Sequence, residues 1–308
     1  MALLYKSDPV RGARWKALFA QHAPDIEFRQ WPDIGDPKEI RYLLAWQPPE
    51  NIMDSLPSLE VLFATSAGVD QFDFDALPPE LPVVRMLDPA IESGMIEYAT
   101  FATLWLHRRM GDYVRQQREG QWQAHMLVPA AQRRIGVLGL GQLGSTIASH
   151  FAGYGFAVSG WARSSRQVQD VACYHGEAEL DEFLSSSDIL ICVLPLTDAT
   201  RGILNSDLFA RLPEGAALIN IGRGEHLVDH DLTQALDDGH LSAAVLDVLS
   251  EEPPADDHPF WQDERILLTP HVAAMTQPDS AFPVLLDNLR RHQRGEPMIG
   301  RVDPQRGY

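Results

Sequence analysis

The sequence has few cysteines and no long apolar run. Its two cysteines, Cys173 and Cys192, show neither the spacing of a metal site nor that of a redox motif, so we expect no metal. The opening stretch MALLYKSDPV has Lys6 and Asp8 inside its apolar run, which is unlike a secretory leader. No segment approaches the roughly 20 apolar residues that span a bilayer. We therefore expect a cytoplasmic protein that does not enter a membrane.

Basic residues are also scarce. The chain has 25 Lys and Arg against 43 Asp and Glu, a net charge of −18. Because phosphate-rich partners are bound by charge neutralisation, this balance excludes nucleic acid as the expected partner. Excess acid keeps a protein dispersed in water and is also found in salt-adapted proteins, and the composition does not separate these two explanations.

Apolar runs alternate with amphipathic stretches along the chain. The 308 residues exceed the size of one core, so two domains are expected. The alternation predicts an α/β protein with two Rossmann-like or flavodoxin-like domains built on parallel sheets. The strands that we expect are ALLYKS, YLLAW, VLFATS and VVRML, followed by RRIGVLGLG, FAVSGWA, DILICVLPL, AALINIG, LSAAVLDVL and RILLTPH.

The position of a glycine-rich turn sets the order of the domains. The turn comes only near residue 139, so a first α/β domain precedes a dinucleotide-binding domain. We predict a substrate-binding domain over 1–98 plus 279–308 and an NAD(P)-binding Rossmann domain over 99–278. The active site is expected in the cleft between them.

Two helical patterns connect the predicted domains. One helix is expected over 94–122, followed by a loop over 125–132. The final helix is expected over 280–297 and should return to the first domain.

The glycine turn has the context of a dinucleotide site. It lies in VLGLGQLG, between the strand-like RIGVL and the helical pattern STIASHFAGYG. Gly139 permits the tight turn, Gly141 lets the backbone approach a pyrophosphate, and Gly144 lets helix and strand pack closely. Gln142 and Leu143 lie at the start of the helix, whose free N–H groups attract phosphate.

The acidic residue that usually follows such a turn is missing. A carboxylate about 20 positions on would hold the ribose 2′-hydroxyl of NAD, and this sequence has Ala162 there. Guanidinium groups and hydroxyls can bind a 2′-phosphate instead, so we predict NADP, with NADPH preferred over NADH. The residues expected around the adenosine are Trp161, Arg163, Ser164 and Arg166.

Polar residues interrupt three other apolar strand ends. Arg223 follows a buried strand in INIGRGEHLVD, Glu252 comes shortly after another in LDVLSEEPP, and His271 follows a third in LLTPHVAA. Reduction of a carbonyl builds negative charge on oxygen, which needs a proton donor and a nearby cation. His271 can donate the proton, Glu252 can hold its other ring nitrogen, and Arg223 can pair with a substrate carboxylate.

The order and spacing of these motifs resemble the D-2-hydroxyacid dehydrogenase family. The resemblance rests on the glycine turn, LPLT, TRGIL, INIGRG, DVLSEEP and TPHVAA, and it covers essentially the whole chain. LLAWQPP, SAGVD, IEYA, GWARS and the ending GRVDPQRGY are similar to its glyoxylate/hydroxypyruvate reductase A branch. The usual DVF of the family reads DVL here, which affects local packing only.

The resemblance implies roles for particular residues. Arg223, Glu252 and His271 would form a catalytic triad, and Asp247 would orient the nicotinamide carboxamide. The backbone around Ala67 and Gly68 would bind the substrate carboxylate, and Arg223 and His271 would also contact the substrate. A homodimer is implied as well. The cofactor would be lined by Leu194, Pro195, Leu196, Thr197, Ile221 and Gly222.

Trp46 is a candidate for the control of substrate size. It follows the predicted strand YLLAW and precedes Pro48 and Pro49. A tryptophan there can be a core residue, or it can cap the space beyond C3 of a keto acid.

Three functions fit these observations. The first is NADPH-dependent reduction of small 2-keto acids, such as glyoxylate and hydroxypyruvate, to D-2-hydroxy acids, glycolate and D-glycerate. The second is an NAD-dependent D-2-hydroxyacid dehydrogenase acting on another substrate, such as D-lactate or phosphoglycerate. The third is a non-catalytic dinucleotide-sensing protein, since corepressors share this fold. The complete Arg–Glu–His set favours an enzyme, and the missing acid favours NADP.

Overall fold

The computed structural model describes residues 1–69 and 71–303. Asp70, at the end of the SAGVD motif, and 304–308, at the end of the GRVDPQRGY motif, lie outside the described residues. The chain forms two compact units, the first comprising Met1–Ser93 and Met275–Tyr308 and the second Gly94–Ala274. These divisions lie four or five residues before the predicted ones, at 98/99 and 278/279.

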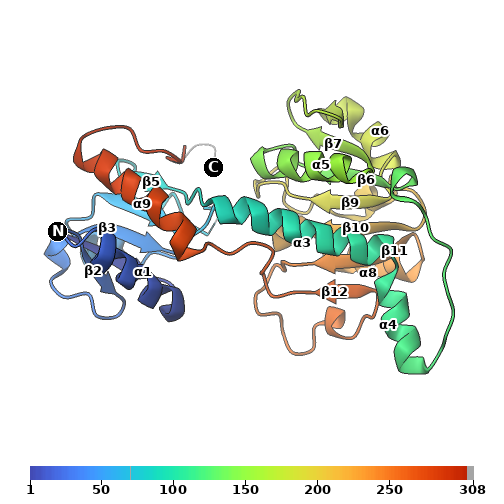
Figure 1. Cartoon of the computed structure of the whole chain (residues 1–308), viewed down its shortest axis with the longest axis horizontal. Helices are drawn as coiled ribbons and strands as arrows, with labels where there is room; N and C mark the ends of the chain where they lie inside the picture. Colours follow the sequence, from blue (N-terminus) through green and yellow to red (C-terminus); the bar gives the residue numbers. More distant parts are fainter. Residues whose placement is uncertain (70, 304–308) are drawn as a thin grey trace. The chain divides into compact units, whose positions relative to one another are not determined.

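The first unit is built on a five-stranded sheet (Figure 1). The strand order is β2-β1-β3-β4-β5, and every pair is parallel. This is the flavodoxin-like order, in which the chain reverses direction across the sheet between β1 and β3. The strands are β1 (Ala2–Lys6), β2 (Glu27–Gln30), β3 (Ile40–Ala45), β4 (Val61–Ala64) and β5 (Val83–Val84), and the helices are α1 (Pro9–His22), η1 (Pro37–Glu39), α2 (Ile52–Ser55) and α9 (Pro278–Gln293).

Helices cover both faces of this sheet because its central strands are apolar on both sides. Tyr5 and Phe63 share one buried cluster with Trp15 of α1 and Phe282 of α9. The opposite face packs against a second cluster that includes Ile52 of α2. The C-terminal helix therefore packs on the first unit, as its sequence predicted.

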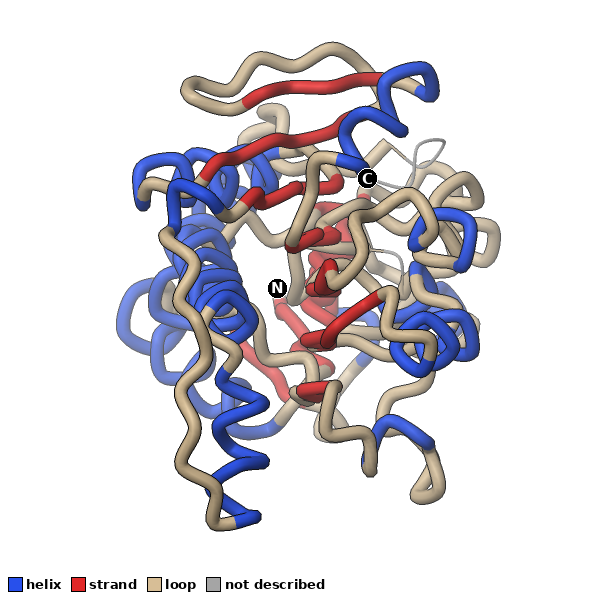
Figure 2. Tube along the Cα trace, turned by 90° about the vertical axis from the view of Figure 1, so that its right-hand side faces the viewer, coloured by secondary structure: helices blue, strands red, loops and turns tan. Residues whose placement is uncertain are grey.

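The second unit is built on a seven-stranded sheet in the order β12-β11-β10-β9-β6-β7-β8, again parallel throughout. The order reverses between β6 and β9, as in the Rossmann fold. In Figure 2 helices flank the strands on both sides. The prediction of two parallel sheets is confirmed. The strands are β6 (Arg134–Leu138), β7 (Ala157–Ala162), β8 (Ala172–His175), β9 (Ile189–Cys192), β10 (Ala216–Asn220), β11 (Leu241–Leu246) and β12 (Ile266–Leu268).

Three helices of the second unit, α3, α4 and η2, precede its first strand, and the others lie between or after its strands. Pro89–His107 (α3) begins in the first unit and continues into the second. Within the described residues no helix is both long and apolar enough to cross a bilayer. The remaining helices are α4 (Met110–Glu119), η2 (Ala130–Gln132), α5 (Gln142–Tyr154), η3 (Glu177–Glu179), α6 (Leu180–Ser185), α7 (Ser206–Phe209), η4 (Gly224–His226), α8 (Asp229–Asp237) and η5 (Pro259–Trp261).

The predicted helix over 94–122 is wrong in its bounds and in its continuity. It begins at Pro89, and it divides into α3 and α4 at Arg109, whose φ of 54° is left-handed. The Arg109 side chain bonds to Asp112 in the first turn of α4. A residue in the left-handed region ends one helical ladder, so a continuous apolar pattern does not guarantee a continuous helix.

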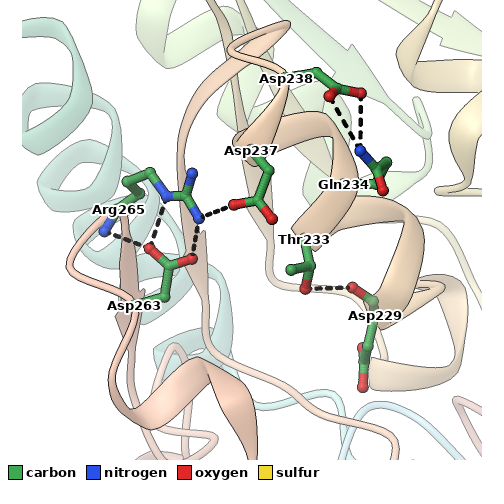
Figure 3. A network of polar contacts seen from close by, with 7 residues as sticks. All are labelled: Asp229, Thr233, Gln234, Asp237, Asp238, Asp263 and Arg265. Carbon is green, nitrogen blue, oxygen red and sulfur yellow. Dashed lines mark hydrogen bonds and ion pairs between the residues drawn. The ribbon is translucent and has the colours of Figure 1, made fainter.

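Strand β12 is anchored at its start by a polar network (Figure 3). Arg265 bonds to both carboxylate oxygens of Asp263 and also to Asp237 at the end of α8, at 2.6–2.9 Å. A two-pronged guanidinium–carboxylate contact fixes direction as well as distance. These contacts join α8 to the turn that precedes β12, which in turn leads to His271.

Candidate active site

The side chains singled out in the sequence follow the carboxyl ends of the strands of the second unit. Parallel strands present these ends at one edge of a sheet, where ligands bind in open α/β folds. The order of appearance is Gly139–Gly144 after β6, Ala162–Arg166 at the end of β7, Leu194–Thr197 after β9, Ile221–Arg223 after β10, Asp247–Glu252 after β11 and Thr269–His271 after β12.

The glycine turn fits a dinucleotide pyrophosphate. Gly139 has a φ of 115°, which an L side chain rarely adopts. A Cβ on Gly144 would lie 1.8 Å from the Gly139 carbonyl oxygen, whereas a Cβ on Gly141 would meet no atom within 4 Å. Gly141 is the N-cap of α5 and brings no side-chain cap. Turn and helix therefore pack tightly, while the space beside Gly141 at the start of α5 is open, as an anion at a helix N-terminus requires.

The end of β7 lacks the acid that usually holds an unphosphorylated ribose. Ala162 is buried, and the four residues that follow it, Arg163 to Arg166, are all exposed. Arg166 lines an open pocket of about 670 Å³ together with His175 and Glu179. His175 pairs with Ala162 in the parallel register of β7 and β8. The pocket thus holds the guanidinium of Arg166 together with an ion pair, because His175 Nδ1 lies 3.0 Å from the Glu179 carboxylate.

Glu252 and His271 form the centre of the site. The Glu252 Oε2 atom lies 2.9 Å from His271 Nδ1, and Oε1 accepts from the Leu249 N–H at 3.0 Å. The side chains are 38% and 31% exposed, so the pair can reach a ligand. Because a carboxylate only accepts, it selects the form of His271 that carries a proton on Nδ1. The Nε2 atom is then the one that can exchange a proton with a substrate.

The charges at this centre support each other. The hydrogen bond to Glu252 raises the pKa of His271, although burial and the charge of Arg223 oppose it. Burial by itself would raise the pKa of Glu252, but the bonds from His271 and Leu249 and the charge of Arg223 outweigh it and leave that pKa lowered. His271 is therefore charged to a higher pH than a free histidine, as a proton donor for neutral solution requires.

The backbone of His271 is held in a strained conformation. Its φ of 53° lies in the left-handed region, and its N–H donates to the carbonyl oxygens of Asp247 and Thr269 at 2.8 and 3.0 Å. The Asp247 carboxylate accepts from the N–H groups of Val272 and Ala273 at 2.9 and 2.8 Å. Such strain persists only where neighbouring contacts fix it, and these contacts surround His271 on both sides.

Asp247 has a structural role that the sequence analysis did not predict. It is 1% exposed, and burial raises its pKa. Thr269 Oγ1 donates to it at 2.6 Å, and Tyr98 of α3 bonds to Thr269 at 2.5 Å. The carboxylate thus clamps the segment that carries His271. Contact with a nicotinamide carboxamide stays a prediction.

Arg223 sits on a turn that is packed against the loop carrying Glu252. The Arg223 carbonyl accepts from Asn220 Nδ2 at 2.9 Å, and its guanidinium donates to the Gly222 carbonyl at 2.8 Å. A Cβ on Gly224 would lie 1.8 Å from the carbonyl carbon of Leu249. Only glycine allows this approach, so the positions of Arg223 and the Glu252 loop are set together.

The remaining predicted residues lie in the first unit. Trp46 follows β3 and is 39% exposed, and Ala67 and Gly68 follow β4 and are half-buried. The Ser66 hydroxyl donates to the Gly68 carbonyl at 2.7 Å, which closes the turn. Trp46 is therefore not a core residue, and these residues occupy the carboxyl ends of their own sheet.

Several residues of the site escaped the sequence analysis. Thr269 and Tyr98 hold Asp247, His226 contacts the turn of Arg223, and His175 lines the pocket beside Arg166. A polar residue within an apolar stretch is the only signal that the sequence offers for them. Among the described residues, no group of three or more His, Cys, Asp or Glu side chains could hold a metal ion.

Comparison with known proteins defines the class of protein. Residues 100–273 match the family model of the D-isomer specific 2-hydroxyacid dehydrogenase, NAD binding domain. The chain belongs to this family of NAD(P)-dependent oxidoreductases, as its motifs predicted. It is 41% identical over 302 residues to the glyoxylate/hydroxypyruvate reductase A of Photorhabdus laumondii, with 96% of each chain covered. Its identity to the protein of the same name from Yersinia enterocolitica is 38% over 301 residues, again with 96% of each covered.

Solved structures of the family have the same fold. A D-isomer specific 2-hydroxyacid dehydrogenase from Xanthobacter autotrophicus, in complex with NADPH and MES, superposes with a TM-score of 0.93 at 38% identity and covers 100% of this chain and 99% of its own. An NADPH-dependent glyoxylate/hydroxypyruvate reductase from Sinorhizobium meliloti, in complex with NADP and sulfate, has a TM-score of 0.92 at 32% identity with the same coverage.

The pairing of Glu252 with His271 predicts a pH effect. In Glu252→Gln the amide can still accept from Nδ1 but carries no charge, so the pKa of His271 should fall. The alkaline limb of the rate of keto acid reduction should therefore move to lower pH. The measurement is kcat/KM against pH for the wild type, for Glu252→Gln and for Glu251→Gln, whose side chain is exposed at the neighbouring position. An unchanged limb in Glu252→Gln would contradict the coupling.

Proposed function

We propose that this protein reduces small 2-keto acids such as glyoxylate and hydroxypyruvate to D-2-hydroxy acids, and that it uses NADPH in preference to NADH. The observation that carries the proposal is the hydrogen-bonded pair of Glu252 and His271, with the charge of Arg223 acting on both. The pair lies at the same sheet edge as the glycine turn. Family membership supports the reaction class.

The side chains of the site perform separate tasks in this reaction. The bound nicotinamide supplies the hydride that reaches the keto carbon. His271 donates the Nε2 proton to the oxygen on which charge develops, and Glu252 keeps the ring oriented and charged until then. Arg223 pairs with the substrate carboxylate and polarises the keto oxygen. The family resemblance further assigns the backbone around Ala67 and Gly68 to the substrate carboxylate, and Trp46 is the proposed limit on substrate size.

The preference for NADPH rests on the end of β7. A carboxylate at Ala162 would repel a 2′-phosphate, and Arg163 with Arg166 would attract one. Two family structures that resemble this chain contain NADPH or NADP. The proposed cofactor contacts are those of the glycine turn and of the segments after β7, β9 and β10.

The alternatives lack comparable support. A dinucleotide-sensing protein needs no Glu252–His271 pair, yet the pair is formed. An NAD-dependent dehydrogenase would have a carboxylate at Ala162.

We also propose that the protein is a cytoplasmic homodimer. The segment after α4 exposes large apolar side chains, with Trp122 103%, Met126 92% and Leu127 63% exposed. Within a monomer this area would stay in water, and a second copy could cover it. Sedimentation equilibrium measures the molecular mass directly.

The proposed reaction predicts the effect of removing the acid. With NADPH, the wild type should reduce glyoxylate and hydroxypyruvate, and His271→Ala should lower kcat by about 10²–10⁴-fold while NADPH still binds. His258, which also lies beside a carboxylate at 3.3 Å, is the matched control, and His258→Ala should keep its activity. A wild type that reduces no keto acid would refute the function.

The cofactor proposal predicts a ratio of efficiencies. One charge-assisted contact of about 1.5–3 kcal/mol corresponds to roughly 10- to 150-fold in kcat/KM for NADPH over NADH. Arg163→Ala should reduce the value for NADPH and leave that for NADH nearly unchanged, whereas Arg211→Ala, which removes a surface partner of Asp181, should change neither. Equal efficiency of the wild type with both cofactors would show that no 2′-phosphate site exists.

The exposed Trp46 predicts substrate size. Two- and three-carbon keto acids should be reduced well and the branched 2-ketoisocaproate poorly, because the indole caps the space beyond C3. Trp46→Ala should narrow the gap, mainly by admitting the larger acid, as kcat/KM for the three substrates would show. Trp31, 43% exposed in the same unit, provides the control Trp31→Ala. An unchanged preference in Trp46→Ala would assign the limit to other residues.

A further inference from the structure

His226 is a fully buried histidine between two functional segments. It is the last residue of η4, three positions after Arg223, and none of its surface is exposed. One side of its ring faces the turn of Arg223, and the other faces Pro195 in the loop after β9. Neither the reaction nor the family motifs used above assign it a task.

Each ring nitrogen of His226 has a backbone partner with a fixed chemical sense, and Nδ1 also lies 3.9 Å from the Cys192 thiol. The backbone N–H of Arg223 donates to Nδ1 at 3.1 Å, so Nδ1 carries no proton. The Pro195 carbonyl lies 3.3 Å from Nε2 and can only accept, so Nε2 carries the proton. The ring is therefore neutral, and it cannot flip to exchange the positions of its two nitrogens without breaking both bonds.

The surroundings leave the ring little freedom. A Cβ on Gly222 would lie 3.0 Å from Nδ1 and 3.3 Å from the Leu194 carbonyl oxygen. The His226 backbone is held too, because its N–H donates to the Arg223 carbonyl at 3.3 Å and its carbonyl accepts from Leu204 at 2.8 Å. In a close-packed interior such a ring transmits position from one neighbour to the other.

We infer that His226 is a positioning residue that sets Arg223 relative to the loop of Pro195. Nδ1 holds the backbone of the residue that pairs with the substrate carboxylate. Nε2–H holds the segment Leu194–Thr197, which is proposed to line the cofactor. The inference rests on the proposed function for the meaning of the two segments, but the contacts themselves do not depend on it.

Two substitutions can separate the two bonds. Asparagine places its amide near the position of Nδ1, so His226→Asn can keep an acceptor for Arg223 N–H and loses the contact with Pro195. Glutamine reaches the position of Nε2, so His226→Gln can keep a donor for Pro195 and loses the acceptor for Arg223. The loss of either buried hydrogen bond should lower the affinity for the ligand bound by the segment it holds by about tenfold.

The experiment measures binding as well as turnover. NADPH affinity is obtained by fluorescence titration, and the affinity of the NADPH complex for oxalate, a dicarboxylate that cannot accept a hydride, reports on Arg223. His226→Asn should lower the affinity for NADPH and leave the affinity for oxalate unchanged. His226→Gln should have the opposite effect, with an unchanged affinity for NADPH and a lower affinity for oxalate. In steady state the first should raise the KM for NADPH and the second the KM for glyoxylate.

Controls separate positioning from stability. His240 also presents its Nε2 to a carbonyl, that of Phe209 at 2.7 Å, so His240→Gln should keep both affinities. Thermal unfolding of every variant shows whether lost affinity follows lost stability. Should either His226 variant fail to fold, Gly222→Ala retains His226 but pushes a methyl group against its ring, and should weaken both ligands.

The inference would be overturned if both His226 variants lost affinity for both ligands to the same extent. It would also be overturned if neither variant lost affinity for either ligand. Wild-type affinities in Gly222→Ala would do the same. A wild type that binds NADPH and oxalate with the expected pattern in the variants but reduces no keto acid would refute the proposed function and leave the role of His226 intact.

Discussion

The parallel register of the second sheet is the constraint on which the site depends. One row of paired residues crosses five neighbouring strands, β6, β9, β10, β11 and β12. The row consists of Leu138, Cys192, Asn220, Leu246 and Leu268. Each of these residues is the last of its strand, so the loops that follow start at one level. A shift of one residue in any strand would turn its side chains to the other face. Backbone hydrogen bonds thus align the loops of the site independently of its functional side chains.

In the loops that follow this row of residues, buried contacts hold the functional groups in position. Burial disfavours the charge of Asp247 and raises its pKa, and three hydrogen-bond donors offset part of this effect. The same donors flank His271 and keep its backbone left-handed. Gly224 fixes the turn of Arg223 against the loop of Glu252. These buried contacts therefore support the partly exposed side chains of Glu252 and His271, whose charges must stay close together.

Exposure divides the site into parts with different tasks. Ala162 is buried while the arginines after it are exposed, which suits recognition of a charged group at the surface of the unit. The Glu252–His271 pair is partly exposed, which permits proton exchange while keeping a lower dielectric than water. His226 and Asp247 are buried. The His226 ring is neutral and the Asp247 carboxylate accepts several hydrogen bonds, which suits residues that hold their neighbours in position.

The sequence alone determined the two parallel sheets, the glycine turn, the missing acid at Ala162 and the three polar strand ends, because each is a local pattern with a local cause. It did not reveal the edge strands β2 and β8, whose residues EFRQ and ACYH lack the apolar pattern of central strands. It gave a continuous helix where Arg109 turns left-handed, and it did not show that Tyr98 reaches Thr269 or that His226 reaches Pro195. These features were decided by tertiary structure, since contacts between residues far apart in the chain depend on packing and leave no period or spacing in the sequence.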